Sequence, residues 1–237
     1  MNKKPVRKRV LGGLLLGTIC WFSYGGTSPE GDMGSELLSQ RVETFFLKKA
    51  SMKDAVEKLR AMGLRICFEE TSNSQKEATT DENISLNLRN RMLREILDHL
   101  VEQVPGYGWT KQDNTNLIVI HPKTNSVLSW NIPALRVKGR SLMELLIQQD
   151  VLKLKEHGII LFYRGFSQPL EQRVSVDLEN VSVIVCLNAL IASHPTLCWT
   201  LSVTPRGKKI LTLNFAHRED KPQRNIPPPN KLSSPLK

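Results

Sequence analysis

The sequence predicts an α+β protein made of two tandem copies of a small β-α-β-β-α-β-β module, and three observations support this. The composition is that of a globular protein, with 40% hydrophobic and 24% charged residues among 237, which leaves room for two small domains. The chain repeats itself at an offset of 90 residues. Each repeat also contains period-two and helical apolar patterns, which predict strands and helices.

The internal repeat is the strongest of these signals. Residues 84–109 align with 174–199 without a gap, and seven of the 26 aligned positions are identical. Self-similarity at a fixed offset indicates that one structural unit occurs twice. The identical pairs are Ser85/Ser175, Leu88/Leu178, Asn90/Asn180, Leu97/Leu187, Leu100/Leu190, Pro105/Pro195 and Trp109/Trp199.

The first copy is expected to span 42–122. A strand-like segment at 42–47 precedes Ser51 and Asp54, which have the spacing of a capping box at the start of a helix. Apolar residues after Ser51 recur at i, i+3, i+4 and i+7, which predicts the helix itself. Gly63 is suited to end that helix in a left-handed conformation.

The rest of the first copy is predicted to contain further strands, a loop and a second helix. A short apolar strand over 64–68 leads into an acidic loop over 69–83, where we interpret Glu69 and Glu70 as solvated side chains rather than as a paired acid site. The remaining predicted elements are a half-buried strand over 84–88, a second helix capped by Asn90, and a hairpin formed by 107–110 and 117–120.

The second copy is expected to span 128–217 and to repeat these elements. It differs in that its first helix extends through a charged insert over 150–156. Helix caps are predicted at Ser141 and Asn180, a helix end at Gly158, and a hairpin turn at Pro205-Arg206-Gly207.

Both ends of the chain carry its positive charge. Residues 1–25 contain five bases, an apolar run and then small residues, the pattern of a signal peptide that is either cleaved or kept as an inner-membrane anchor. A linker over 26–41 leads to the first copy, and the proline-rich tail over 218–237 is expected to be disordered. Residues 26–217 carry a net charge of only +2, which argues against binding of nucleic acid.

Export places the chain in the periplasm, where cysteines can pair. Cleavage leaves three cysteines, an odd number, and the sequence has no C-x-x-C spacing for a redox or zinc site. Cys67 lies in an apolar strand and is interpreted as a core residue. Cys186 and Cys198 either form a disulfide or stay free.

The pattern of apolar positions and caps resembles the STN domain, the short N-terminal domain of secretins and TonB-dependent outer-membrane receptors. The resemblance implies a periplasmic module that binds protein partners and catalyses no reaction. It rests on Phe46-Leu47, Ser51-x-x-Asp54-Ala55, Gly63-Leu64 and Ile84-Ser85-Leu86-Asn87-Leu88 in the first copy, and more weakly on Trp130-Asn131-Ile132-Pro133-Ala134 in the second.

The sequence lacks the spacings of common catalytic sites, such as H-E-x-x-H, G-x-S-x-G and the P-loop. We therefore expect no enzyme activity, catalytic residue, cofactor, metal or small-molecule substrate. Arg206, Lys208 and Lys209 form a basic hairpin tip, the candidate contact for an acidic partner. The predicted function is an exported adaptor of the bacterial envelope that binds a secretin, a TonB-type receptor or a regulatory protein. The alternative is a periplasmic sensor that binds a small ligand between the two modules.

Overall fold

The described residues all belong to one compact unit of the chain, Asp32–Lys237. Its described residues form a mixed α+β fold, as the sequence predicts at that level. None of the described helices is both long and apolar enough to cross a membrane. The computed structural model describes residues 33–71, 83–113, 115–147, 152–163 and 172–216.

Apart from α1, helices and strands follow one another in the same order in two parts of the chain, which we call the first half (33–122) and the second half (131–215). The first half contains α1 (Met33–Ser39), β1 (Arg41–Ala50), α2 (Met52–Ala61), β2 (Arg65–Glu69), β3 (Ile84–Met92), α3 (Leu93–Gln103), β4 (Tyr107–Lys111) and β5 (Leu117–Pro122). The second half contains β6 (Asn131–Ser141), α4 (Leu142–Ile147), β7 (Ile159–Tyr163), β8 (Arg173–Ser182), α5 (Val183–Ala192), β9 (Leu197–Val203) and β10 (Lys209–Phe215).

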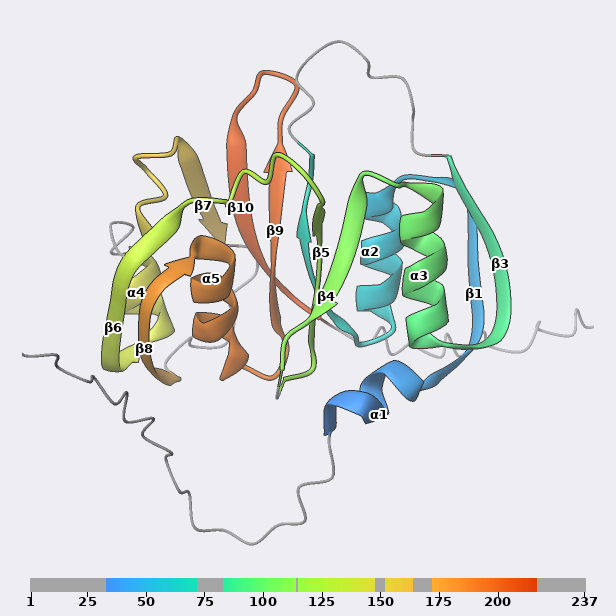
Figure 1. Cartoon of the computed structure of the whole chain (residues 1–237), viewed down its shortest axis with the longest axis horizontal. Helices are drawn as coiled ribbons and strands as arrows, with labels where there is room; N and C mark the ends of the chain where they lie inside the picture. Colours follow the sequence, from blue (N-terminus) through green and yellow to red (C-terminus); the bar gives the residue numbers. More distant parts are fainter. Residues whose placement is uncertain (1–32, 72–82, 114, 148–151, 164–171, 217–237) are drawn as a thin grey trace, which may run out of the picture. The chain divides into compact units, whose positions relative to one another are not determined.

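A six-stranded sheet with the order β4-β5-β2-β9-β10-β7 runs through both halves. The first three strands belong to the first half, the last three to the second half, and the parallel pairing of β2 with β9 joins them. Each half adds an antiparallel two-stranded ribbon, β1 with β3 and β6 with β8. In Figure 1, α2 and α3 lie between the sheet and the β1-β3 ribbon, whereas α4 and α5 lie between the sheet and the β6-β8 ribbon.

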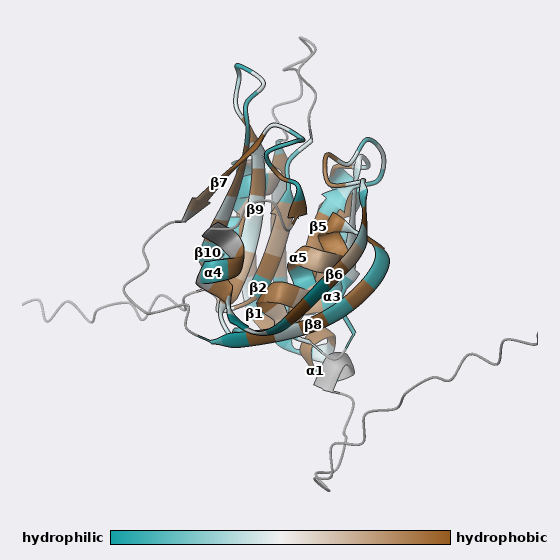
Figure 2. Cartoon of the chain, turned by 90° about the vertical axis from the view of Figure 1, so that its left-hand side faces the viewer, coloured by the Kyte–Doolittle hydropathy of each residue, from teal (hydrophilic) through white to brown (hydrophobic). Residues whose placement is uncertain are grey.

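Two hydrophobic cores lie on opposite faces of the six-stranded sheet, because successive side chains of a strand point to opposite faces. One core packs Ile66 and Phe68 of β2 against α2 and α3. The other packs against α5, which is apolar along most of its length (Figure 2). This second core also contains three residues of the first half, Cys67, Leu117 and Val119. Strand β2 is therefore buried on both faces.

The predicted helix caps at two equivalent serines are confirmed. The Asp54 amide donates to the Ser51 hydroxyl at 3.1 Å, and the Glu144 amide donates to the Ser141 hydroxyl at 3.2 Å. Each acidic side chain also accepts from the backbone amide of its serine, which completes a capping box. The predicted hairpins are confirmed too, since β4 pairs antiparallel with β5 and β9 with β10.

The predicted caps at Asn90 and Asn180 are wrong. Strand β3 continues through Asn90 to Met92, and β8 continues through Asn180 to Ser182. Both asparagines have left-handed backbone, with φ of 50° and 51°, which asparagine tolerates better than most residues. They bend the ends of long strands, and the following helix begins after Met92, whose amide donates to Glu95 at 3.1 Å.

Two predicted boundaries also change. The linker expected over 26–41 contains α1, whose Leu38 is buried in the first core, and β1 already begins at Arg41. Helix α4 ends at Ile147, and 152–158 form turns rather than a continuation of the helix. The predicted signal segment, the predicted tail and most of the acidic loop over 69–83 lie outside the described residues.

The two ribbons have the same register, displaced by 90 residues. Arg41 lies opposite Met92 in one ribbon, and Asn131 lies opposite Ser182 in the other. Both ribbons carry an irregularity at the same place, where the backbone turns left-handed at Lys49 and at Gly139. The amides of these two residues donate to equivalent serines, Ser85 and Ser175.

Each half contains a tryptophan that is anchored in the same way. The Trp109 indole N–H donates to Asp98 of α3 at 2.9 Å, and the Trp199 indole N–H donates to Asn188 of α5 at 2.9 Å. Trp199 is fully buried, whereas Trp109 is half-buried. Both pack against a core.

Candidate functional site

The parallel contact between β2 and β9 forms a junction between the halves, defined here as these two strands and the side chains that bridge them. Phe68 lies opposite Thr200, and the Glu70 amide donates to the Leu201 carbonyl at 2.8 Å. The Glu70 carboxylate also accepts from the Val203 amide at 3.2 Å. Backbone pairing therefore continues past the end of β2, so the two halves are joined by more than side-chain packing.

Two buried arginines of the first half reinforce this junction. The Arg60 guanidinium donates to the Trp199 carbonyl at 3.0 Å. The Arg65 guanidinium donates to the carbonyls of Ile191 and Leu197, at the end of α5 and the start of β9, at distances of 2.8–3.2 Å. Burial lowers the pKa of Arg65. The Ile191 carbonyl also accepts from the His194 amide at 3.0 Å. All of these arginine contacts are with backbone carbonyls of the second half, so the arginines have a structural role.

Glu69 is the most buried acidic group at the junction, and the prediction that it lies in a solvated loop is wrong. It is the last residue of β2 and is fully buried. Its carboxylate accepts from the Ser126 hydroxyl at 2.8 Å and from the amides of Val127 and Leu128. Burial raises the pKa of the Glu69 carboxyl, and these hydrogen bonds oppose the rise. The side chain thus fixes the segment that connects the halves.

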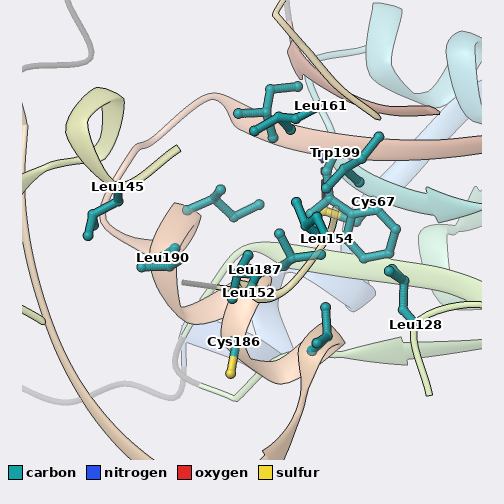
Figure 3. Close-up of a cluster of buried hydrophobic side chains, with 14 of the residues drawn as sticks. Cys67, Leu128, Leu145, Leu152, Leu154, Leu161, Cys186, Leu187, Leu190 and Trp199 are labelled. Carbon is teal, nitrogen blue, oxygen red and sulfur yellow. Dashed lines mark hydrogen bonds between the residues drawn. The ribbon is translucent and has the colours of Figure 1, made fainter. Parts of the chain in front are cut away.

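The three described cysteines are free thiols, and all are buried. Figure 3 shows Cys67 next to Trp199 in the second core, with Cys186 further away on α5. The Trp199 amide donates to the Cys67 sulfur at 3.4 Å. Burial raises the pKa of all three thiols, which makes them unreactive at neutral pH. They act as small core residues.

The two edges of the six-stranded sheet, β4 and β7, pair on one side only among the described strands. Strand β7 carries two large exposed apolar side chains, Ile160 (46% exposed) and Phe162 (57% exposed). They alternate with Ile159 and Leu161, which are buried in the second core. An open strand edge with apolar side chains is a typical place for another strand to bind.

The predicted basic site is a well-defined turn between β9 and β10. The Thr204 amide donates to the Lys208 carbonyl at 2.8 Å, and the Lys208 amide donates to the Thr204 hydroxyl at 3.0 Å. Gly207 has a φ of 73°, which favours glycine at this position. Arg206 and Lys208 are exposed, and Lys209 is half-buried at the start of β10. Within the described ranges, none of these three bases forms an ion pair.

Sequence reasoning found the basic turn but missed the junction and the β7 edge. The turn is local, whereas Arg60, Arg65 and Glu69 acquire their partners from residues far along the chain. A usable signal did exist for β7. Its run Ile159-Ile160-Leu161-Phe162 is apolar on both faces, which is typical of a strand covered on both sides.

No group of three or more His, Cys, Asp or Glu side chains that could hold a metal ion is found among the residues described. An open depression on the surface lies beside α1, lined by Glu36, Leu37, Ser39, Gln40 and Asn116. Comparison of the chain with protein-family models, with curated proteins and with solved structures finds no match.

Proposed function

We propose that this chain is an exported, non-enzymatic adaptor of the bacterial envelope, built from two copies of one STN-like module, 42–122 and 128–217. The support for two copies is geometric. The ribbons share one register, the capping boxes coincide, and both indoles are anchored on equivalent helices, α3 and α5. A secretin, a TonB-type receptor or a regulatory protein is the partner class that the STN resemblance suggests.

The observation that carries the proposal is the hydrogen-bonded basic turn at 204–209. Its three cationic side chains stand on a hydrogen-bonded turn, and none is neutralised by a described acid. A cluster of like charges attracts an acidic segment and steers its approach to the surface. The acidic segment of an envelope protein therefore docks on Arg206, Lys208 and Lys209.

Reversing these three charges is expected to slow partner binding at least about ten-fold at low salt, because rim charges act mainly on the association rate. The substitutions are Arg206→Glu, Lys208→Glu and Lys209→Glu. The measurement is capture from envelope extract, followed by association rates for the captured protein at two ionic strengths. The loss should shrink at high salt, where exposed charges are screened.

A charge-matched control reverses three exposed bases elsewhere, Arg94, Lys123 and Lys155. It has the same net charge as the test variant and is expected to bind at nearly the rate of the unmodified chain. Equal rates for both variants, or recovery of the same proteins by all three chains, would show that the basic turn is not the docking site.

The sensor alternative requires space for a ligand between the halves. The junction is instead filled by side chains that are fully buried, including Cys67, Glu69 and Trp199. The depression beside α1 lies within the first half, away from these residues. A saturable thermal shift with a small molecule would support the sensor over the adaptor.

A further inference from the structure

We infer that β7 of one copy of this chain binds β4 of a second copy, in the way that β2 binds β9 within the chain. This contact uses the two edges of the six-stranded sheet, β4 and β7, which have no second partner among the described strands. It is separate from the basic turn on which the proposed function rests.

Strand β7 is the second-half equivalent of β2. Each strand follows a glycine with left-handed backbone, Gly63 or Gly158, whose amide donates to the carbonyl three residues earlier. Each strand also pairs parallel with the last strand of its half, so that Cys67 lies opposite Val119 and Phe162 lies opposite Thr212. Phe162 therefore occupies the place of Cys67, and Ile160 occupies the place of Arg65.

Strand β4 is likewise the first-half equivalent of β9. Each strand opens the antiparallel hairpin that ends its half. Trp109 lies opposite Ile120 in the first hairpin, and Trp199 lies opposite Leu213 in the second. Trp109 of the open edge therefore corresponds to Trp199 of the junction.

The directions of the strands show that the junction can be repeated. Equivalent strands follow in the same order across the sheet, β4-β5-β2 and then β9-β10-β7. Strand β9 runs parallel to β2, whereas its equivalent β4 runs antiparallel to β5 and thus to β2. The second half is therefore turned by about half a revolution around an axis across the strands, which also explains why the helices lie on opposite faces (Figure 1). Because the halves follow each other head to tail, one edge strand of the sheet, β7, is equivalent to β2, and the other edge strand, β4, is equivalent to β9.

Residues at the sheet edges are less buried than their equivalents at the junction, as expected where a neighbouring strand is missing. At the junction, Cys67 and Trp199 lie on the same face of the sheet and are fully buried. At the open edges, Phe162 is 57% exposed and Trp109 is half-buried. Repeating the junction between two copies places Phe162 of one beside Trp109 of the other and covers both aromatic rings.

A second copy fits this edge better than an unrelated strand does. Any strand supplies backbone hydrogen bonds, but the chain's own β4 edge also brings a half-buried tryptophan to the position where Phe162 is exposed. The first half of that copy carries its helices on the face where Ile160 and Phe162 lie, since this face is the one that α2 and α3 cover. Because the contact joins different edges, it generates a ring or an open series rather than a closed dimer.

The first test is the molar mass of the purified full chain in solution over a range of concentrations, measured by light scattering. The unmodified chain is expected to exceed the mass of a dimer as concentration rises. Phe162→Asp is expected to weaken this association about ten-fold or more, as loss of a central aromatic contact does. Phe46→Asp is the matched control, because Phe46 is 49% exposed but lies on β1, outside the six-stranded sheet.

Association that is equal in Phe162→Asp and Phe46→Asp, or a chain that is monomeric at every concentration, would overturn the inference. Circular dichroism of each variant confirms that it is folded, which is expected since both side chains are exposed in the chain itself. Loss of partner binding by the basic-turn variant with unchanged self-association would leave this inference intact, so the two proposals fail separately.

The second test fixes the geometry by cross-linking. A chain with Phe162→Cys is mixed with a chain of different mass that carries Trp109→Cys, and the mixture is oxidised. Facing positions on paired strands are close enough for a disulfide, so the expected product joins the two different chains. A product that joins two Phe162→Cys chains instead would show edge-to-edge pairing of β7 with itself and would exclude the head-to-tail contact.

Discussion

Residues 33–122, produced without the second half, are expected to melt at least about 15 °C below the full chain or to fail to fold cooperatively. The second half covers one face of the first half's sheet, and its removal exposes Cys67, Leu117 and Val119, which are all buried. A large apolar side chain contributes roughly 1.5–3 kcal/mol when buried. One kcal/mol shifts the melting temperature by about 4–8 °C in a domain of this size.

The control keeps all the contacts but breaks the chain. A protease site placed at the exposed residues 123–125 allows the halves to be separated after folding. The cleaved complex should melt close to the intact chain, because the junction and both cores are unchanged. If the isolated first half melts cooperatively at the temperature of the full chain, the second core contributes little to the stability of the first half. Calorimetry measures all three samples.

This expectation differs from the one that the sequence alone suggests, which is two modules with separate apolar faces. The sequence predicts the local features well. The capping boxes at Ser51 and Ser141 and the two hairpins depend on residues a few positions apart, and all four are confirmed. The pairing of Phe68 with Thr200 depends on residues 132 positions apart, and no local pattern signals which edge strand will meet which.

The wrong caps show a second limit of local reasoning. Asparagine is a good helix cap, but it also tolerates the left-handed conformation that bends a strand. At Asn90 and Asn180 the second property determines the structure, because pairing with β1 and β6 extends each strand two residues further. The two asparagines share the left-handed conformation because they are equivalent positions of the repeat, although the helix caps predicted for them are wrong.

Charge alone also misleads at the end of β2. Glu69 and Glu70 precede further acids in the sequence, which favours a solvated loop. Three donors in the connecting segment, the Ser126 hydroxyl and the amides of Val127 and Leu128, make burial of the Glu69 carboxylate possible. Their positions are set by the tertiary structure, so the sequence does not reveal them.

Replacing Glu69 by leucine is expected to destabilise the protein by about 3 kcal/mol or more, because each buried donor left without a partner costs roughly 1–3 kcal/mol. For a protein of this size the melting temperature should fall by about 10 °C. Glu69→Gln is the matched variant. Its amide oxygen can accept from Val127 and Leu128, and its amide nitrogen can donate to the Ser126 hydroxyl, so the expected cost is about 1 kcal/mol or less.

The same pair of variants tests the effect of pH. Because burial raises the pKa of Glu69 above its ordinary value of 4.5, the folded chain binds a proton more readily than the unfolded chain does. Lowering the pH through the folded pKa toward 4.5 should therefore stabilise the unmodified protein relative to Glu69→Gln, and below 4.5 the gain should be complete. Denaturant unfolding of both proteins between pH 7 and pH 4 measures this difference. A difference that moves the opposite way would mean that the hydrogen bonds outweigh burial and hold the pKa of Glu69 below 4.5.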